Sequence, residues 1–294
     1  MSYGVLGEPP VPSDATSATK STSWIAALAA IAERIRRAIA LDATPNINTS
    51  PMQEPAQMSE DEVRVPHDRP YIEQTSLVTS LHFSGHETQS QMWNHAPHAL
   101  ALEYTQTMMG FLLFLPKPQS IAMIGLGGGS LAKFCYRHLA QVRIDVVEIN
   151  PQVLSMRSTF RIPADNERFH VHLGDGADYV RQARQAFDVL LVDGYDRNGM
   201  PLRLCSADFY RHCRRALTGN GVMVANITCE HPSYKRVITS IRNVFGSNVL
   251  VVGDKDCTND VVIAWMGELD DSLLSDRGRS SLIHGDTWDD LDPA

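Results

Sequence analysis

The chain has 294 residues, 43% of them hydrophobic, a formal net charge of −8 and a pI of about 5.7. This length allows one large domain, with or without a smaller one, and the acidic balance argues against a nucleic-acid-binding protein. No apolar run approaches the roughly 18 residues that span a bilayer, so we expect no membrane partner. The five cysteines are scattered without a CxxC pair, which predicts reduced thiols in a cytoplasmic protein.

The composition of residues 1–69, which are rich in Pro, Ser, Thr and Ala, predicts a mostly disordered N-terminal extension. The exception is 22–41, where Trp24, Leu28 and Ile31 recur at helical spacing with basic residues between them. This pattern predicts an amphipathic helix that packs on its own chain or on a partner subunit. A membrane-surface or targeting helix is the alternative, but the first residues lack the basic start and apolar core of a signal peptide.

Residues 71–95 predict a small antiparallel β unit, because short alternating segments surround a turn at Ser84-Gly85. A helix is then predicted to begin near Pro97, since proline suits the first turn of a helix. This helix should continue to about Phe114.

A regular alternation of strands and helices follows, over 96–267. Strands are predicted at 120–125, 142–148, 168–173, 187–193 and 221–227, with helices near 130–140, 151–159, 176–186, 206–217 and 233–245. Two final strands, near 247–252 and 260–266, are joined by only about seven residues, and a parallel crossover needs roughly a dozen. The fold class is therefore α/β, a Rossmann-like, mostly parallel sheet with a C-terminal antiparallel hairpin. The segment 268–294 predicts an acidic tail.

Glycines and acids follow the first three strands of this predicted domain. They are Gly125, Gly127 and Gly129 after the first strand, Glu148 at the end of the second, and Asp175 and Gly176 after the third. Ligands of open α/β sheets lie beyond the carboxyl ends of the strands, so these residues predict a nucleoside site. The glycines let a ligand lie against bare backbone, and the acid binds the ribose hydroxyls.

The nucleoside is expected to belong to a sulfonium compound rather than to a dinucleotide. A nicotinamide-binding turn would have a third glycine where Ser130 stands, and a dehydrogenase usually needs a further substrate domain. The antiparallel hairpin suits the fold of S-adenosylmethionine-dependent enzymes. In that arrangement Glu148 would hold the ribose and Asp175 would accept from the adenine amino group.

Two acids at the end of the fourth strand, Asp193 and Asp196, suit an amine nucleophile. One carboxylate can take the proton of the attacking amine while the other holds a distal ammonium, and positioning should supply most of the rate. The alternatives are that Asp193 is a solvated acid and that Asp196 caps a turn. Tyr104, on the helix that should cover the site, is either a substrate contact or a core aromatic.

Four histidines between residues 82 and 98 match no familiar spacing of metal ligands, so no metal is expected.

Over about 71–266 the chain resembles the spermidine synthase family, the polyamine aminopropyltransferases. The motifs that carry the resemblance are the glycine turn, Val-Glu-Ile-Asn at 147–150, Gly-Asp-Gly at 174–176 and Asp-Gly-Tyr-Asp at 193–196. The resemblance implies a small N-terminal β domain before the Rossmann-like domain, and a homodimer or larger assembly. It also implies that Asp193 is the catalytic base, that Tyr104 contacts substrate, and that Glu148 and Asp175 hold decarboxylated S-adenosylmethionine.

Three departures from the family pattern leave the reaction open. Gly128 stands where the family has an aspartate for the aminopropyl amine, Gly-Tyr replaces Ser-Ser at 194–195, and the groove segment is altered at 254–259. The first hypothesis is aminopropyl transfer to a small amine such as putrescine. The second is methyl transfer from S-adenosylmethionine to an amine-bearing acceptor, and the third is a non-catalytic relative that keeps the nucleoside pocket.

Overall fold

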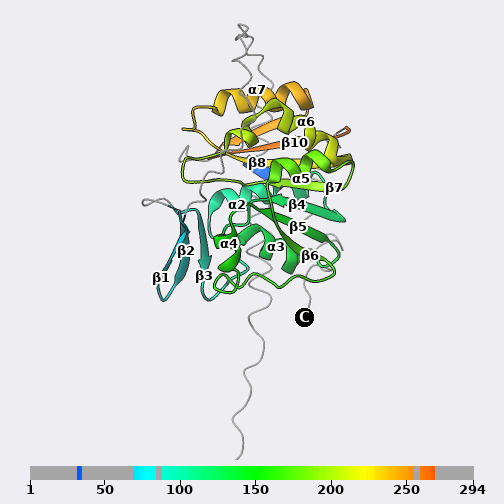
Figure 1. Cartoon of the computed structure of the whole chain (residues 1–294). Coiled ribbons are helices and arrows are strands. Elements are labelled where there is room, and N and C mark those ends of the chain that lie inside the picture. The colour runs from blue at the N-terminus through cyan, green and yellow to red at the C-terminus, as the bar shows by residue number, and fades with distance from the viewer. Residues whose placement is uncertain (1–31, 35–68, 84–87, 254–258, 269–294) are drawn as a thin grey trace, which may run out of the picture.

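The computed structural model describes residues 32–34, 69–83, 88–253 and 259–268 (Figure 1). The predicted extension and acidic tail therefore lie almost wholly outside the described residues, as does the Ser84-Gly85 turn. Of the amphipathic helix predicted at 22–41, only residues 32–34 are described, and they are helical.

A seven-stranded sheet forms the centre of the described structure. Its strands are β4 (Ser120–Ile124), β5 (Arg143–Glu148), β6 (Phe169–Leu173), β7 (Phe187–Val192), β8 (Leu217–Thr228), β9 (Val249–Gly253) and β10 (Asn259–Trp265). The spatial order is β6-β5-β4-β7-β8-β10-β9, with neighbours from β6 to β8 parallel and β10 antiparallel to both β8 and β9. The predicted α/β sheet with a C-terminal antiparallel hairpin is confirmed. The insertion of β10 between β8 and β9 was not predicted.

Helices cover both faces of this sheet (Figure 1). They are α2 (Glu103–Met108), η1 (Met109–Leu113), α3 (Ser130–His138), α4 (Pro151–Ser155), α5 (Gly176–Gln182), η2 (Leu202–Cys205), α6 (Ala207–Ala216) and α7 (Tyr234–Phe245). Alternate residues of β4 point to opposite faces, as in any strand. Ile121 and Met123 join the apolar cluster of η1 and α3, whereas Ala122 and Ile124 join that of α5, α6 and α7. With helices on both faces, the carboxyl ends of the parallel strands are the expected place for a site.

The helix predicted to begin near Pro97 begins at Glu103 instead, so that prediction was wrong. Trp93 and Ala96 form an isolated antiparallel bridge, and the Ala99 amide donates to the Ala96 carbonyl at 3.0 Å. These bonds hold Pro97 in a turn that follows the small sheet. Further along, η1 ends at Leu113, close to the predicted end.

Two other helices are shorter than predicted. The helix α4 ends at Ser155 rather than near residue 159, and α5 ends at Gln182 rather than near residue 186. After α4 the chain turns tightly, and Arg161 has a φ of 53°. The Lys133 ammonium donates to the Phe160 carbonyl at 2.8 Å, which holds this turn against α3. A long-range contact of this kind leaves no local signal in the sequence.

The predicted β unit is a three-stranded antiparallel sheet of β1 (Tyr71–Gln74), β2 (Val78–His82) and β3 (Ser90–Trp93). It lies beside α3 and α4 (Figure 1). Ser90 of β3 approaches Ser130 at the start of α3, with 3.5 Å between the two hydroxyl oxygens. The small sheet therefore reaches the glycine turn of the larger one.

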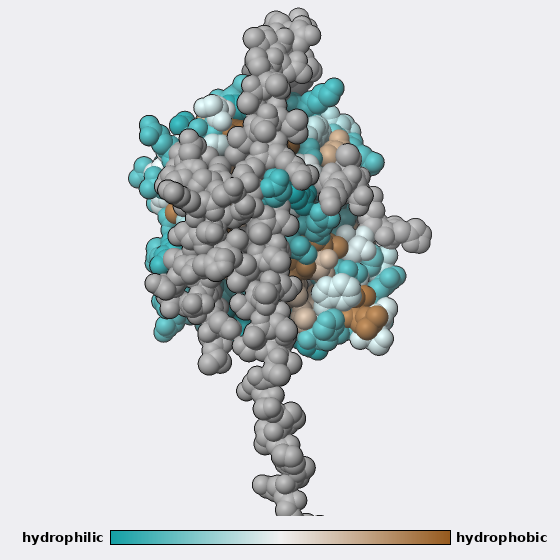
Figure 2. Space-filling model, turned by 180° about the vertical axis from the view of Figure 1, so that it is seen from behind, coloured by the Kyte–Doolittle hydropathy of each residue, from teal (hydrophilic) through white to brown (hydrophobic). Residues whose placement is uncertain are grey.

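Among the described residues, none of the helices combines the length and hydropathy needed to cross a bilayer. On the face shown in Figure 2, the residues drawn in colour are mostly polar, and apolar ones form small patches. The four cysteines that the structure describes are free thiols.

Candidate active site

The glycine turn after β4 lies directly against the end of β7. Gly125 has a φ of +92°, and a Cβ atom there would lie 2.2 Å from the Asp193 carbonyl oxygen. The Gly125 amide donates to the Val147 carbonyl, and the Asp193 amide donates to the Ile124 carbonyl, each at 2.9 Å. Only glycine fits this position, because a side chain would meet both an unfavourable φ and a neighbouring backbone. The turn therefore brings together the carboxyl ends of β4, β5 and β7.

Glu148 lies buried beneath this turn, with only 7% of its surface exposed. Its two carboxylate oxygens accept from the Leu126 amide at 2.9 Å and from the Asn150 amide at 2.8 Å. Gly127 and Gly129, the other predicted glycines, follow Leu126 with φ values of +51° and +67°. A carboxylate can accept about four hydrogen bonds, so Glu148 keeps capacity for two ribose hydroxyls while holding the turn.

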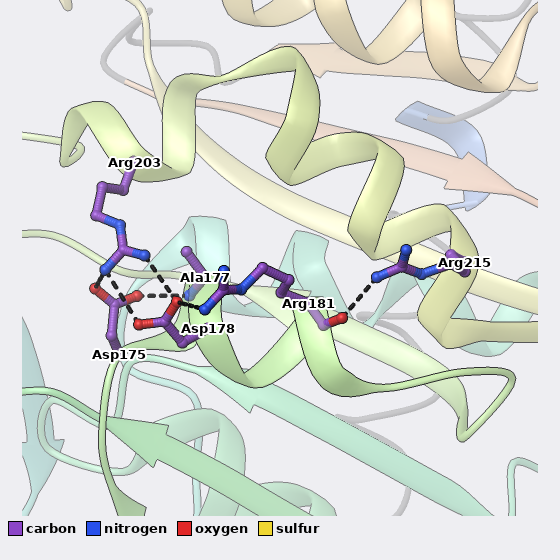
Figure 3. Close-up of polar contacts among 6 residues, drawn as sticks. All are labelled: Asp175, Ala177, Asp178, Arg181, Arg203 and Arg215. Atoms are coloured by element: carbon purple, nitrogen blue, oxygen red, sulfur yellow. Dashed lines mark hydrogen bonds and ion pairs between the residues drawn. The ribbon is translucent and has the colours of Figure 1, made fainter. Parts of the chain in front are cut away.

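Asp175 caps the N-terminus of α5 and also pairs with an arginine from the loop after β7 (Figure 3). Its Oδ1 accepts from the Ala177 amide at 2.7 Å, and its Oδ2 pairs with Arg203 at 2.5 Å. Arg203 also pairs with Asp178 at 2.8 Å. Asp175 was predicted to accept from the adenine amino group, and the structure adds a capping role and a cationic neighbour. Arg203 was not identified from the sequence.

Gly176, which follows Asp175, packs its backbone against Ile124 of β4. A Cβ atom at Gly176 would lie 2.4 Å from a methyl carbon of Ile124. The start of α5 can approach the end of β4 this closely because the residue is glycine.

Exposed apolar side chains lie at the same edge of the sheet as Glu148 and Asp175. Three of the five large hydrophobic residues that are exposed in the described structure lie at this edge of the sheet, namely Ile149, Leu173 and Leu202. Leu173 pairs with Glu148 in the sheet, and Leu202 immediately precedes Arg203. Exposed apolar side chains beside hydrogen-bonding groups suit a flat base such as adenine. Ile149 belongs to the Val-Glu-Ile-Asn motif but was not predicted as a site residue, although its position directly after Glu148 was a usable signal.

Asp193 is held by two hydrogen bonds from different elements. Its Oδ1 accepts from the Asn226 amide group of β8 at 2.9 Å, and its Oδ2 accepts from the Tyr104 hydroxyl of α2 at 3.2 Å. Burial raises the pKa of Asp193 above its ordinary value, and the two hydrogen bonds act in the opposite direction. Asn226 was missed from the sequence, although it is the one amide in the apolar strand predicted at 221–227.

Tyr104 remains a neutral donor in this arrangement. Burial, followed by the negative charge of Asp193, raises its pKa well above the ordinary tyrosine value. Tyr104 packs against the apolar core as an aromatic side chain and also donates its hydroxyl to Asp193, so its contact with substrate stays a prediction.

Tyr195 braces the loop that begins at Asp193. Its hydroxyl donates to the Asn226 carbonyl at 2.8 Å and accepts from the Thr228 amide at 2.9 Å. The Gly-Tyr pair that departs from the family pattern therefore attaches this loop to β8.

Asp196 forms a tight turn. Its Oδ1 accepts from the Asn198 amide at 2.7 Å, and its backbone exchanges hydrogen bonds with Gly199. Within the described residues, no hydrogen bond joins the Asp196 carboxylate to the side chain of Asp193 or Tyr104. This geometry fits the alternative in which Asp196 caps a turn, and its binding of a distal ammonium stays a prediction.

Gly128 faces a space that other side chains already fill. A Cβ atom there would lie 2.7 Å from the Ser90 hydroxyl oxygen and 2.9 Å from the Phe160 ring. An aspartate at this position would need both neighbours to move. The Ser90 hydroxyl oxygen that lies beside Gly128 is also 3.5 Å from the Ser130 hydroxyl oxygen.

His82, one of the clustered histidines, is used within the small sheet. It stacks on Tyr71 with 5.1 Å between ring centroids, and its Nε2 lies 3.7 Å from Glu73. Among the described residues, no group of three or more His, Cys, Asp or Glu side chains could hold a metal ion.

Comparisons with known proteins agree with the resemblance seen in the sequence. A family model described as the spermine/spermidine synthase domain matches residues 101–253. A polyamine aminopropyltransferase of Neisseria meningitidis is 37% identical over 196 residues, which cover 66% of this chain and 74% of that protein. An eEF1A lysine and N-terminal methyltransferase of Homo sapiens is 31% identical over 146 residues, covering 45% of this chain and 21% of that protein.

A solved structure shares the fold. The probable spermidine synthase of Corynebacterium glutamicum aligns with a TM-score of 0.63 at 20% identity, covering 74% of this chain and 86% of that one. The region matched by the family model, 101–253, contains the glycine turn and the acids Glu148, Asp175 and Asp193. The chain is therefore a transferase that belongs to the spermine/spermidine synthase family.

Proposed function

We propose that the protein transfers an aminopropyl group from decarboxylated S-adenosylmethionine to a small amine such as putrescine. The observation that carries this proposal is the enclosed Asp193 carboxylate, oriented by Asn226 and Tyr104 beside the glycine turn. It lies at the sheet edge that also carries Glu148 and Asp175.

The reaction is a direct displacement at carbon. The amine nitrogen forms a bond to the aminopropyl carbon, the carbon–sulfur bond breaks, and methylthioadenosine leaves as a neutral thioether. The proton of the amine passes to Asp193. Because burial raises the pKa of Asp193, its carboxylate is a stronger base than an exposed one. The negative charge of Asp193 also attracts the sulfonium of the donor and the ammonium form of the acceptor amine to the same place.

The described residues fit the nucleoside of such a donor. Glu148 has acceptor capacity for two ribose hydroxyls, and Asp175 has capacity for the adenine amino group beside Arg203. Ile149 and Leu202 offer apolar surface to the base. We propose that Gly125, Gly127 and Gly129 let the rest of the donor lie close to the backbone.

Methyl transfer from S-adenosylmethionine is a second candidate, and Gly128 favours it. Because Gly128 has no carboxylate, this position does not attract the ammonium of a decarboxylated donor. For the same reason, the carboxylate of S-adenosylmethionine meets less repulsion here. The Ser90 and Ser130 hydroxyls could donate to that carboxylate. The similarity to a methyltransferase over part of the chain also supports this candidate.

The released nucleoside distinguishes the candidates. The purified full chain is incubated with putrescine and decarboxylated S-adenosylmethionine, and separately with S-adenosylmethionine and a panel of small amines. We expect methylthioadenosine from the first mixture. Release of S-adenosylhomocysteine only, from the second mixture, would favour methyl transfer. No product from any amine, together with binding of methylthioadenosine, would favour a non-catalytic relative.

We also propose that the protein is a cytoplasmic homodimer, as its family resemblance implies. Light scattering of the purified full chain tests the oligomeric state.

Replacing Arg203 by alanine is expected to weaken methylthioadenosine binding about fivefold, or roughly 1 kcal/mol. Arg203 holds η2, and with it Leu202, against α5 through Asp175 and Asp178 (Figure 3). The pair is partly exposed, so salt should weaken binding in the wild type more than in the variant. Titration calorimetry at low and high salt measures both effects.

Arg181→Ala is the matched control, because Arg181 pairs with Asp178 but forms no ion pair with Asp175 in the described structure. Equal losses in the two variants would contradict a role for Arg203 at the nucleoside site.

A further inference from the structure

A helical turn at residues 32–34 packs against the main body, outside the region matched by the family model. Ala32 has 5% of its surface exposed and belongs to the apolar cluster that includes residues of η1 and α3. Arg34 extends its guanidinium from this turn over α2, and its side chain is 21% exposed. The segment therefore contributes both an apolar contact and a charged one.

The Arg34 guanidinium joins α2 to the end of β9. Its Nη1 donates to the Glu103 carboxylate at 2.8 Å and to the Thr107 hydroxyl at 3.0 Å, while its Nη2 donates to the Gly253 carbonyl at 2.8 Å. Glu103 and Thr107 lie four residues apart, one turn of the helix, and so share a face of α2. One side chain thus fixes α2 at two points and attaches it to the sheet.

The position of α2 matters because Tyr104 lies on it. This helix has only six residues, and its N-cap residue, Leu102, makes no side-chain hydrogen bond. Short helices have little stability of their own, so tertiary contacts must set the place of α2. Tyr104 directly follows Glu103, and a rotation of α2 would change the 3.2 Å hydrogen bond from Tyr104 to Asp193.

We propose that Arg34 is a positioning residue that holds α2 so that the Tyr104 hydroxyl reaches Asp193. This inference rests on the proposed function, because it assigns Arg34 to the same reacting centre. It makes an N-terminal segment outside residues 101–253 part of the support of the active site. Arg34 itself does not touch the reacting atoms.

A change in pH dependence would separate this role from general stabilisation. The groups that face Asp193 are Tyr104 from α2, Asn226 from β8 and Tyr195 from its own loop. The Tyr104 hydrogen bond lowers the pKa of Asp193, so loss of that bond should raise it. A base works in its ionised form, and the acid limb of kcat/KM should therefore move to higher pH.

The test compares the full-length wild type with Arg34→Ala, Arg34→Lys and the control Arg211→Ala. Arg211 pairs only with Asp208, three residues away on the surface of α6, among the contacts that the structure records. We expect Arg34→Ala to lower kcat about five- to tenfold with the donor KM within twofold, and to shift the acid limb upward. Arg34→Lys should recover part of kcat, since lysine keeps the charge but not the two-pronged geometry. Arg211→Ala should match the wild type.

Glu103→Gln keeps the inference testable if Arg34→Ala fails to fold. It removes the ionic part of the contact at an exposed site and should lower kcat two- to threefold with a smaller shift of the same sign. Wild-type kcat and pH profiles in both variants would overturn the inference, as would equal losses in Arg211→Ala. An inactive wild type that still binds methylthioadenosine would instead contradict the proposed function.

Discussion

Replacing Asp193 by asparagine is expected to lower kcat about 10²- to 10⁴-fold, the range that general-base removal typically gives. An amide oxygen can still accept from Tyr104, and the Asn226 side-chain amide can turn over so that its unpartnered oxygen accepts from the new NH₂ group. The variant should therefore keep the local geometry while losing the group that takes the proton. The KM for the donor should change little, because we propose that Glu148 and Asp175, rather than Asp193, supply the nucleoside contacts. Steady-state release of the nucleoside product measures both constants.

The same substitution should raise the melting temperature near neutral pH. Burial raises the pKa of Asp193, so the folded state binds this proton more tightly than the unfolded state does. As pH rises through the folded pKa, the ionised carboxylate costs stability, and asparagine avoids that cost. The gain in melting temperature should therefore be small at acidic pH and grow toward neutral pH. Differential scanning calorimetry at several pH values measures it.

Asp208→Asn is the control for both measurements, because Asp208 is exposed on α6. It should leave kcat unchanged. A wild-type kcat in Asp193→Asn would refute the assignment of the base.

Replacing Glu148 by glutamine is expected to weaken binding of methylthioadenosine about 10- to 100-fold, or roughly 1.5–3 kcal/mol. The amide supplies a weaker acceptor to the ribose hydroxyls. It also places an NH₂ group against a backbone N–H, since both carboxylate oxygens accept from main-chain amides, those of Leu126 and Asn150. The glycine turn should then lose part of its support. Titration calorimetry with methylthioadenosine measures the change.

Glu167→Gln serves as the control, because Glu167 is exposed before β6. Binding within twofold of the wild type in Glu148→Gln would contradict the role assigned to Glu148. A fall in melting temperature by a few degrees is expected in this variant, because a buried backbone donor loses its acceptor.

The periodic parts of the fold could be predicted from the sequence. Strands β4 to β7 and the acids at their ends follow from apolar runs, glycines and the geometry of parallel sheets. The start of α2 was mispredicted at Pro97, because the bridge between Trp93 and Ala96 depends on the small sheet. Contacts between elements distant in the chain leave no periodic signal, and the roles of Arg203 and Arg34 were missed for this reason.

The sequence by itself determined which edge of the sheet carries the glycine turn and the acids, because glycine backbone freedom and strand-end acids are local properties of the chain. Only the tertiary structure decided how each acid is used. Asp193 is oriented by Tyr104 and Asn226 from two other elements, whereas Asp196 closes its own turn. The physical reason is that a hydrogen bond depends on the positions of both partners, and packing sets the position of a partner that lies far away in the chain.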